Sequence, residues 1–597
     1  MSTQSFKIAR TYPVFQYQNW ISQTEELIDT IPLPDNVLFW GAKGNGVTND
    51  SAAIQRAINA NTPGCLFFPP GTYVCNDPVF ARDNMIIYGC GKTVSVLKAT
   101  LPLSDSMFIC QSVINVQIND LGFNLNSQTI TVSYPIGVSY NPAAVHIRGN
   151  TTTGIAPSTR IKFDRCEYAN SNDTSLVSVE SGSVFTEFAS CRFLNAIPNL
   201  NVVSALDLDT ASRCTIDLCE FDVCQRGINC HTEKSTIISN CRFSSFTSVG
   251  IVDNAQSTSI SGNSFSFNTN SSIGIQTVDL GLGFDTVNSS TYMGNTFRPL
   301  TDGVTFAATG ISASQSRAVS IVGNTFSNLS VPITAFSDNT ISGNTIWNQS
   351  AFGTGITVTG SRNTVTNNYV YLNNIGITAT TPGGEANTIA NNTVYLCGQG
   401  IVCGLQSKLI LSNNQIIDWT SNGINFTASI GTVTFSTVSG NTFSSPITTP
   451  TFGLTTGTGM NDNNMINNNF DAGIANSIST LSLRNRWINN MNETTFNTIT
   501  VAMTTDNQQI TTPASDYKKI VFTSDNATPA NRTAILNAGF YVGQTMLLVG
   551  PVVNSMEIAN NVAASDGTLT FLTGGANLTL ANTFIYVRFD GTNWYQA

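Results

Sequence analysis

Three short stretches in the first half of the chain contain the residues best suited to acid–base chemistry. They read VSVES, ALDLDT and GINCHTE, and in each of them apolar and polar residues alternate. This alternation predicts strands with apolar side chains inward and polar side chains outward. A protonated carboxyl group can donate a proton to a leaving oxygen while a partner carboxylate activates water or attacks, as in glycoside hydrolysis. The residues predicted to do so are Asp207, Asp209 and Glu180, with His231 and Glu233 beside them to bind the substrate.

Charged residues are scarce in this chain, which makes their grouping informative. Only 10% of the 597 residues are Asp, Glu, Lys or Arg, against a usual share of about 25%. Neighbouring carboxylates raise one another's pKa and cost stability, so such a group is usually retained for a function. Arg213 and Arg226, in the turns that link the strands, are predicted to bind or orient the substrate. A solvated acidic face without activity is the alternative interpretation.

A second group of charges receives a structural interpretation. Its members alternate in sign on successive repeats, as a surface ion ladder requires, and they are Glu167, Arg192, Glu220 and Arg242. Exposed pairs of this kind contribute little to stability. Two alignments of the repeats differ at the coil after His231, because one adds Asp253 to the acidic group and the other places Asn254 there. Asp253 is kept as a second choice among the residues predicted to bind the substrate. His146 falls in an early repeat with no acidic partner nearby and is interpreted as structural.

The longest repeat, DLGLGFDTVNSSTYMGNTFRPLTDG, must place its extra residues in an outward loop. Long loops on a rigid scaffold commonly form the walls of binding sites. We therefore expect this repeat to form a groove wall that stacks and orients sugar rings. The polar and aromatic residues available for this are Asp279, Asp285, Tyr292, Arg298 and Asp302, of which Asp285, Tyr292 and Arg298 are predicted to bind the substrate.

These residues can meet only if the chain repeats in space as it does in sequence. A phrase of the form small-x-aromatic, such as CRF or NTF, recurs at steps of 20 to 32 residues between Cys166 and Asn468. Short strands at such a period, stacked about 4.8 Å apart, are typical of a parallel β-helix. A leucine-rich horseshoe would need leucine periodicity, and a propeller would need longer blades with hairpin turns. The first position of the phrase predicts an inner column of cysteines that continues as hydrogen-bonded asparagines.

The glycine-rich stretch GAKGNG, residues 41–46, raises the question of a nucleotide site. A P-loop ends in Lys followed by Ser or Thr, and a Rossmann loop is followed by an acidic residue about 20 positions later. Here Lys43 lies between glycines, and the apolar run 65–68 occupies the place of the acid. The following NDSAAIQRAINA predicts an amphipathic helix from about Asp50. Such a helix can cover the open first coil of a β-helix, so the loop is interpreted as part of a cap.

The segment GAKGNGVTNDSAAIQRAINA…LFFPPGTYVC is similar to the entry segment of pectate-lyase-like right-handed β-helices, as found in phage tailspikes. Together with the repeats, the resemblance covers about residues 37 to 490. It implies an all-β fold, a single-stranded right-handed parallel β-helix. It is less specific for chemistry, because this superfamily includes lyases, hydrolases, epimerases and non-catalytic stalks. Asn45 stands where the family commonly has Asp.

The resemblance to tailspikes also implies a domain organisation. Residues 1–36 are expected to attach the protein to the virion tail or a companion spike. Residues 37–496 are expected to form the β-helix with its N-terminal capping helix, and residues 497–597 a C-terminal β-sandwich for trimerisation or carbohydrate binding. The implied partners are two further copies of the chain in a homotrimer, and a bacterial surface polysaccharide. The implied location is the virion tail, after synthesis in the host cytoplasm, with action at the bacterial cell surface.

The composition narrows the range of partners further. A net charge of −10 without a basic stripe argues against nucleic acid. The N-terminus has no apolar signal core, and the charge-free run 533–556 contains Asn, Gln, Pro and Gly, so membrane insertion is not expected. The thirteen cysteines have no paired CxxC spacing, which predicts buried reduced thiols. Neither a metal nor a cofactor is expected.

The sequence therefore predicts a phage tailspike that depolymerises a capsule or O-antigen by glycoside hydrolysis at paired carboxylates on the β-helix flank. Two alternatives stay open. In a polysaccharide lyase, His231 or a tyrosine would remove the proton beside a uronate carboxylate that Arg226 or Arg213 neutralises. In a non-catalytic receptor-binding adhesin, the same flank would only bind the glycan.

Overall fold

The protein is described here by a computed structural model. The described residues are 35–131, 142–149, 157–180, 182–197, 202–277, 289–301, 303–380, 384–404, 406–427, 433–448, 450–456, 460–471 and, further on, mainly the short strands between 477 and 596. They belong to two compact units, residues 1–320 and 321–597. Most of the expected N-terminal segment, residues 1–34, lies outside the described part of the chain.

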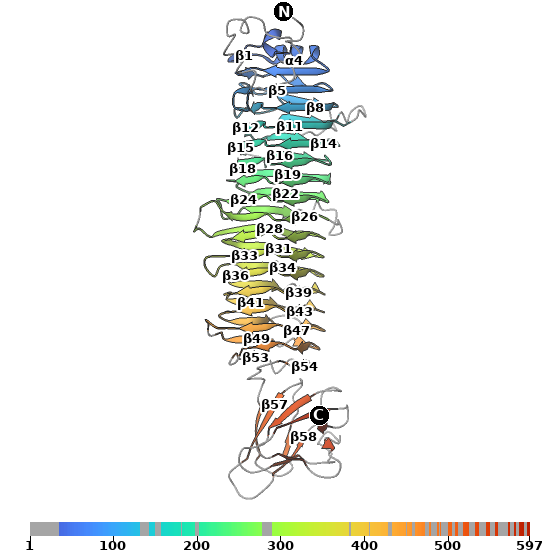
Figure 1. Cartoon of the computed structure of the whole chain (residues 1–597), viewed down its shortest axis with the longest axis vertical. Helices are drawn as coiled ribbons and strands as arrows, with labels where there is room; N and C mark the ends of the chain where they lie inside the picture. Colours follow the sequence, from blue (N-terminus) through green and yellow to red (C-terminus); the bar gives the residue numbers. More distant parts are fainter. Residues whose placement is uncertain are drawn as a thin grey trace, which may run out of the picture. The chain divides into compact units, whose positions relative to one another are not determined.

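The first unit is a parallel β-helix whose successive coils follow the N-terminal helix α4 (Figure 1). Most coils contribute one strand to each of three parallel sheets. The first sheet contains β4 (Val79–Phe80), β7 (Phe108–Gln111), β10 (Ala143–Arg148), β13 (Ser175–Val179), β16 (Ser204–Asp209), β19 (Arg226–Lys234), β22 (Val249–Gln256), β25 (Ile273–Thr277) and β28 (Phe306–Arg317). This sheet carries the predicted acidic residues.

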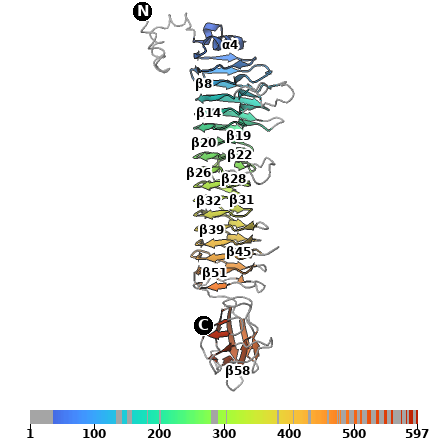
Figure 2. The ribbon, with the colours of Figure 1, turned by 90° about the vertical axis from the view of Figure 1, so that its right-hand side faces the viewer.

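The other two sheets of this unit have the same order along the chain. The second contains β1 (Asn45–Asn49), β3 (Gly71–Val74), β6 (Ser95–Lys98), β9 (Gly122–Asn124), β12 (Glu167–Asn172), β15 (Arg192–Ile197), β18 (Glu220–Cys224), β21 (Arg242–Ser244), β24 (Ser264–Phe267) and β27 (Thr296–Pro299). The third contains β2 (Gly64–Phe68), β5 (Met85–Gly89), β8 (Ile114–Asn119), β11 (Thr159–Asp164), β14 (Val184–Ala189), β17 (Thr215–Asp217), β20 (Ile237–Ser239), β23 (Ser259–Ser261) and β26 (Thr291–Met293). In Figure 2, β14, β20 and β26 of the third sheet lie to the left of β19, β22 and β28 of the first.

Like side chains stack inside the coils, as the repeats predict. The rings of Phe193, Phe221, Phe243 and Phe265 stack nearly parallel, with centroids 4.6 to 4.8 Å apart. Aliphatic side chains form a second inner column, because Val177, Leu206, Ile228 and Ile251 pair in register and are fully buried. These columns give the unit its apolar core and fix which strand residues face outward.

The column of small residues also has the predicted form. Cys166, Cys191, Cys219 and Cys241 are buried free thiols. The column continues with asparagines, and the Asn263 side chain donates Nδ2 to Oδ1 of Asn295 at 3.0 Å. Each amide also reaches main-chain groups of the adjacent coils, so its polar atoms are satisfied inside the core.

The capping helix is α4 (Ser51–Ala60), preceded by the 3-10 helix η1 (Val37–Trp40). Its apolar face, Ala53, Ile54, Ala57 and Ile58, is buried. The glycine loop before it is closed by Asp50, whose carboxylate accepts hydrogen bonds from the N–H groups of Lys43 at 2.7 Å and Gly44 at 3.0 Å. The loop therefore binds a carboxylate of its own chain, in agreement with its interpretation as part of a cap.

The predicted ion ladder crosses the second sheet on successive strands. Arg192 lies 3.7 Å from the Glu167 carboxylate and 3.1 Å from that of Glu220, and Arg242 lies 3.6 Å from Glu220. The four residues pair in register on β12, β15, β18 and β21. The prediction of alternating charges with alternating contacts is confirmed.

The second unit also contains a parallel β-helix with three main sheets. The strand β29 (Ser320–Val322) starts at the last residue of the first unit and belongs mostly to the second. Its first sheet contains β31 (Leu329–Ser337), β34 (Thr354–Val358), β37 (Ile375–Ala379), β41 (Gln399–Cys403), β45 (Asn422–Phe426), β49 (Phe452–Thr456) and β53 (Ser477–Ile478). Its second contains β30 (Thr325–Ser327), β33 (Thr345–Trp347), β36 (Tyr369–Tyr371), β40 (Thr393–Tyr395), β44 (Gln415–Ile417), β48 (Thr442–Ser444) and β52 (Asn469–Phe470). Its third contains β32 (Thr340–Ser342), β35 (Thr364–Thr366), β39 (Thr388–Ala390), β43 (Ile410–Ser412), β47 (Thr437–Ser439), β51 (Asn464–Ile466) and β54 (Arg486–Ile488), and a short fourth contains β38 (Gly384–Glu385), β42 (Gln406–Ser407), β46 (Val433–Thr434) and β50 (Met460–Asn461).

The described strands beyond β54 form two small sheets of mixed direction. One contains β55 (Ile499–Met503), β57 (Lys518–Ser524), β59 (Thr545–Val549), β61 (Phe571–Leu572), β63 (Phe584–Phe589) and β64 (Trp594–Gln596), and the other β56 (Gln508–Ile510), β58 (Arg532–Leu536), β60 (Met556–Ile558) and β62 (Leu578–Leu580). The prediction of a β-sandwich at this end stays a prediction. Among the described residues, no helix has the length and apolar character needed to cross a membrane.

Candidate functional site

The acidic residues meet because β13, β16 and β19 are neighbours in the first sheet. Ser178 pairs with Asp207, Asp207 pairs with Asn229, and Asp209 pairs with His231. Neighbouring strands lie about 4.8 Å apart, and alternate residues on one strand lie about 6.6 Å apart. We use the name acidic cluster for the group that this register brings together, Glu180, Asp207, Asp209, His146 and His231.

Glu180 follows β13 and is almost fully buried. The Ser178 hydroxyl donates a hydrogen bond of 2.7 Å to its Oε1, and Nε2 of His146 lies 3.3 Å from its Oε2. His146 is fully buried on β10, in register with Ser178. The interpretation of His146 as a residue without an acidic partner is therefore wrong. The sequence hides this contact because 32 residues separate His146 from Ser178, and the recurring phrase begins only at Cys166.

A partly buried ion pair lies on the other side of His146. Arg148, on β10, donates to both carboxylate oxygens of Asp105, at 3.2 and 2.9 Å. Its Nη1 and the Ser106 hydroxyl each lie 3.4 Å from Nδ1 of His146. These groups hold the imidazole between an ion pair and the Glu180 carboxylate. The sequence reasoning did not find Asp105, Ser106 or Arg148, which lie in coils before the recurring phrase.

Asp207 points outward from β16, yet its exposed fraction is only 8%. Burial, together with the Glu180 and Asp209 carboxylates, raises the pKa of Asp207 to about 6, while the Asn229 amide and His231 oppose the shift. The Asn229 contact is a hydrogen bond of 2.9 Å to Oδ1. Asp207 therefore exchanges its proton within the range in which a general acid works near neutral pH.

Asp209 differs from Asp207 in its access to solvent, although the two lie on the same strand. The Asp209 side chain is 34% exposed, and Nδ1 of His231 lies 3.1 Å from its Oδ1. His231 is exposed to a similar degree, 39%. Water can therefore reach this carboxylate, which is a requirement for a general base that activates water.

The two predicted arginines lie in different environments. Arg226, the first residue of β19, is half-buried. Burial lowers the pKa of its guanidinium, and the Asp207 charge opposes this shift, so the two charges attract each other. Arg213 instead lies past the turn that follows β16, with its guanidinium 5.2 Å from the ring centroid of Phe185. Arg213 thus belongs to a different group of residues from Asp207.

Asp253 and Tyr292 face the interior, contrary to their prediction as binding residues on the outer surface. Asp253 pairs with Cys230 and Thr277 in an inner column and is fully buried. The Tyr292 hydroxyl donates a hydrogen bond of 2.6 Å to its Oδ2, and Tyr292 is also fully buried. The structure has Asn254 beside His231. A register error of one residue moves a side chain to the opposite face of a strand, which explains the failure at Asp253.

The remaining predicted residues are not brought to the cluster. Arg298 is exposed on β27, in the second sheet, where it pairs with Ser266. The Glu233 side chain, Asp279, Asp285 and Asp302 lie outside the described residues, so their roles stay predictions. In the described part of the chain, no group of three or more His, Cys, Asp or Glu side chains is arranged to hold a metal ion.

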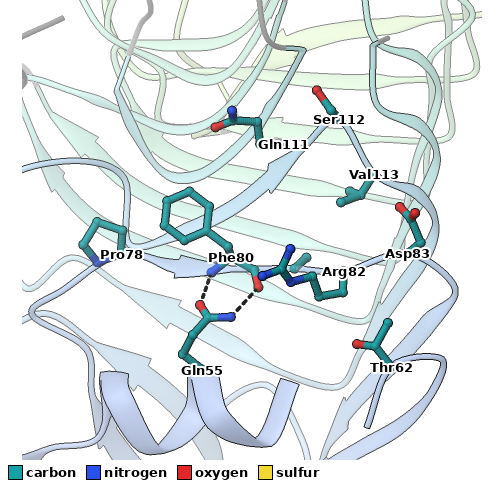
Figure 3. Close-up of a pocket in the computed structure, with 10 residues that line it drawn as sticks. Gln55, Thr62, Pro78, Phe80, Arg82, Asp83, Gln111, Ser112 and Val113 are labelled. Carbon is teal, nitrogen blue, oxygen red and sulfur yellow. Dashed lines mark hydrogen bonds between the residues drawn. The ribbon is translucent and has the colours of Figure 1, made fainter. Parts of the chain in front are cut away.

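A hollow of about 650 Å³ lies near the N-terminal cap, and no member of the acidic cluster is among the residues that line it (Figure 3). The Gln55 side chain, from α4, makes two hydrogen bonds to the main chain of Phe80 at its edge. Asp83 is the carboxylate among the residues that line it, and it accepts the Ile114 N–H at 2.9 Å. This hollow offers volume without an acid–base pair, so we place the chemistry at the acidic cluster.

Comparison with known proteins supports the fold. Residues 35–276 match the family model described as rhamnogalacturonase A/epimerase, pectate lyase-like, and residues 309–470 match that of the right-handed β-helix region. Together with the parallel coils, these matches define the class of protein. The chain contains a right-handed parallel β-helix, and its residues 35–276 are similar to pectate-lyase-like proteins.

Similarity to individual proteins is short or distant. A probable glucan endo-1,3-beta-glucosidase of Arthroderma benhamiae is 37% identical over 76 residues, which is 11% of this chain and 9% of that protein. The pre-neck appendage protein of Bacillus phage phi29 is 35% identical over 63 residues, 11% of this chain and 7% of that protein. The chain therefore spans about a tenth or less of the length of these relatives. Among solved structures, a tailspike protein of E. coli bacteriophage HK620 is 12% identical, with 73% of this chain and 75% of that chain covered and a TM-score of 0.38, too low to support an argument.

Proposed function

We propose that this protein hydrolyses glycosidic bonds of a polysaccharide at the acidic cluster, with Asp207 as the general acid and Asp209 as the general base. One observation carries the proposal: two carboxyl groups on one strand differ sharply in environment. Asp207 is buried, with its pKa raised to about 6, whereas Asp209 is open to solvent. Glycosidases usually carry out acid–base catalysis with two carboxyl groups, one of which is kept protonated by its environment while the other stays ionised.

The roles follow from the chemistry of the bond. Asp207, in its protonated form, donates its proton to the glycosidic oxygen as the bond to the anomeric carbon breaks. Asp209 takes a proton from a water molecule, and the water oxygen forms the new bond to that carbon. His231, 3.1 Å from Asp209, orients the base, and Glu180 favours the protonated form of Asp207 by its negative charge. Proton return through solvent restores both carboxyl groups.

The spacing favours inversion at the anomeric carbon. Alternate residues on a strand lie about 6.6 Å apart, and inverting glycosidases separate their carboxyl groups by about 6.5–9.5 Å to leave room for water. Attack by Asp209 itself would require a separation of about 5 Å. We therefore propose an inverted product, which proton NMR of the first product formed would detect.

We further propose that the enzyme is a tailspike-like component of a phage virion, acting on a bacterial capsule or O-antigen. The sequence similarity to phage appendage proteins supports this. A homotrimer is part of the proposal, and light scattering of the full chain should give about three times 63.8 kDa. A stable monomer would contradict the trimer without affecting the chemistry proposed for Asp207.

The test is a screen of the full-length protein against purified capsular and O-antigen polysaccharides, with reducing ends and ultraviolet absorbance measured together. Hydrolysis raises the reducing ends alone. A rise in absorbance as well would mean an unsaturated product, and would favour the lyase alternative with His231 as base and Arg226 beside the uronate. Binding without new ends would favour the adhesin. Either result would contradict the proposed hydrolysis.

A further inference from the structure

A separate column of outward residues lies where each coil turns from the first sheet into the third. The register of β5, β8, β11 and β14, with a bridge from Val184 to Ser212, aligns one residue from each coil. All members have a left-handed backbone, with φ between 55° and 67°. From the N-terminal side they are Asn84, Asn115, Arg160, Phe185, Arg213, Ser235 and Ser257.

Large side chains occupy the middle of this column. Asparagine tolerates a left-handed backbone well, and the Asn115 amide donates a hydrogen bond of 2.9 Å to Asn84. Phe185, by contrast, has φ 58° and is 47% exposed. Three successive coils carry Arg160, Phe185 and Arg213 in place of small polar residues. The same turn of the second unit carries Arg362, Lys408 and Phe435 with a left-handed backbone, so the turn itself accepts large residues, and the contacts among the three side chains are what mark them as a group.

The three side chains form one surface. The Arg213 guanidinium lies 5.2 Å from the centroid of the Phe185 ring. Arg160 lines a shallow hollow of about 350 Å³ together with Phe185, and Lys162 and Glu187, paired at 2.6 Å, line the same hollow. With the Lys162 charge matched by Glu187, the two arginines supply the excess positive charge.

We propose that Arg160, Phe185 and Arg213 form a second glycan-binding site, specific for sugars that carry a carboxylate. An exposed aromatic ring stacks on the apolar face of a pyranose, and a guanidinium binds a carboxylate through two parallel hydrogen bonds. Arg213 follows Asp209 by four residues, in the short segment that connects β16 to β17. The bound glycan is therefore separated from the acidic cluster by this connecting segment. The site binds and does not cleave, and it is independent of the hydrolysis proposed above.

The test is affinity electrophoresis of the full-length protein through gels containing polygalacturonate, alginate or hyaluronate, with uncharged dextran as the comparison. Cleavage is removed from the measurement by using the Asp207→Asn protein as the parent. We expect at least one acidic glycan to retard the parent and dextran to leave its mobility unchanged. Phe185→Asn and Arg213→Asn should each weaken the binding about tenfold. Asn suits the left-handed backbone, so neither variant should melt earlier than the parent.

Val223→Asn provides the matched control. Val223 is also exposed, at 38%, and has φ 53°, but it lies on β18 in the second sheet. Its variant should bind like the parent. The proposal is overturned if none of the three acidic glycans binds, or if Phe185→Asn binds them as tightly as the parent does. If the wild-type protein binds an acidic glycan through this site but hydrolyses no polysaccharide, only the function proposed for Asp207 is contradicted.

Discussion

Two columns of charge run across the same coils, and they have opposite organisation. In the ion ladder, Arg192 lies between Glu167 and Glu220, so each rung is neutralised by the next. In the acidic cluster, Glu180, Asp207 and Asp209 follow one another, and their contacts are to histidines, a hydroxyl and an amide. The coil geometry is common to both. The difference in sequence therefore decides whether a stacked charge is a structural group or a reactive one.

The pKa of one carboxyl group in each column shows how this decision is made. Burial raises the pKa of Glu167, but Arg192 and Lys92 act against the shift. Burial also raises the pKa of Asp207, and there Glu180 and Asp209 add to the shift. Burial thus raises the pKa of the carboxyl group in both columns and does not distinguish them. The charge of the neighbouring rungs determines whether a proton is held near neutral pH.

Substitutions in the acidic cluster and in the ion ladder should differ most in their effect on turnover. Asp207→Asn and Asp209→Asn should each reduce hydrolysis at least about a hundredfold, because each removes a proton donor or acceptor with little change in shape. Glu167→Gln, in the ion ladder, should leave the rate unchanged. Initial rates of reducing-end formation on the polysaccharide identified by the screen would measure this. Wild-type rates in both Asp variants would show that the acidic cluster is only a solvated surface.

A second prediction concerns the stability cost of the acidic cluster. A group whose pKa is raised by folding contributes stability below its unfolded pKa, and loses that contribution as the pH rises through the folded value of about 6. Above that pH the buried Asp207 charge should cost on the order of 3 kcal/mol. Asp207→Asn should therefore melt later than the wild type at pH 8, and the two should melt alike at pH 4. Equal melting at pH 8 would show that the charge is not destabilising.

The pH dependence of the wild type provides a third prediction. Since Asp207 acts as an acid, kcat/KM should fall about tenfold per pH unit above about 6. A profile of kcat/KM between pH 4 and 9 would show this limb. A rate that instead rises through pH 6 would assign Asp207 the role of base, and would reverse the two carboxyl groups.

The smallest effect is expected in the ion ladder. Glu220→Gln removes the partner of both Arg192 and Arg242 on the surface. Exposed ion pairs contribute about 0–1 kcal/mol, so the melting temperature should change little and even less in high salt. Arg148→Met, which removes the partner of the more buried Asp105, should lower the melting temperature more than Glu220→Gln does. A larger decrease for Glu220→Gln would contradict the structural role given to the ion ladder.

Sequence reasoning predicted the coils, the cap, the ion ladder and the grouping of Asp207, Asp209 and His231, because each depends on a repeat that stays regular there. It failed at Asp253, where one residue of register error exchanges the inner and outer faces. It also missed His146 as the partner of Glu180, because the long coil between them breaks the count. The depth of Asp207 was not predictable, since burial of an outward side chain depends on neighbouring coils that periodicity does not describe.

The asparagine column of the second unit has a consequence for how such proteins change over time. From Asn344 to Asn468, each amide donates to the next at 2.9 or 3.0 Å, always in the same direction. Every interior coil therefore presents the same acceptor at one face and the same donor at the other. A whole coil can be duplicated or deleted without leaving an unmatched amide. The members of the column are 22 to 27 residues apart, so insertions in the turns leave the series intact, whereas loss of a single asparagine would break it.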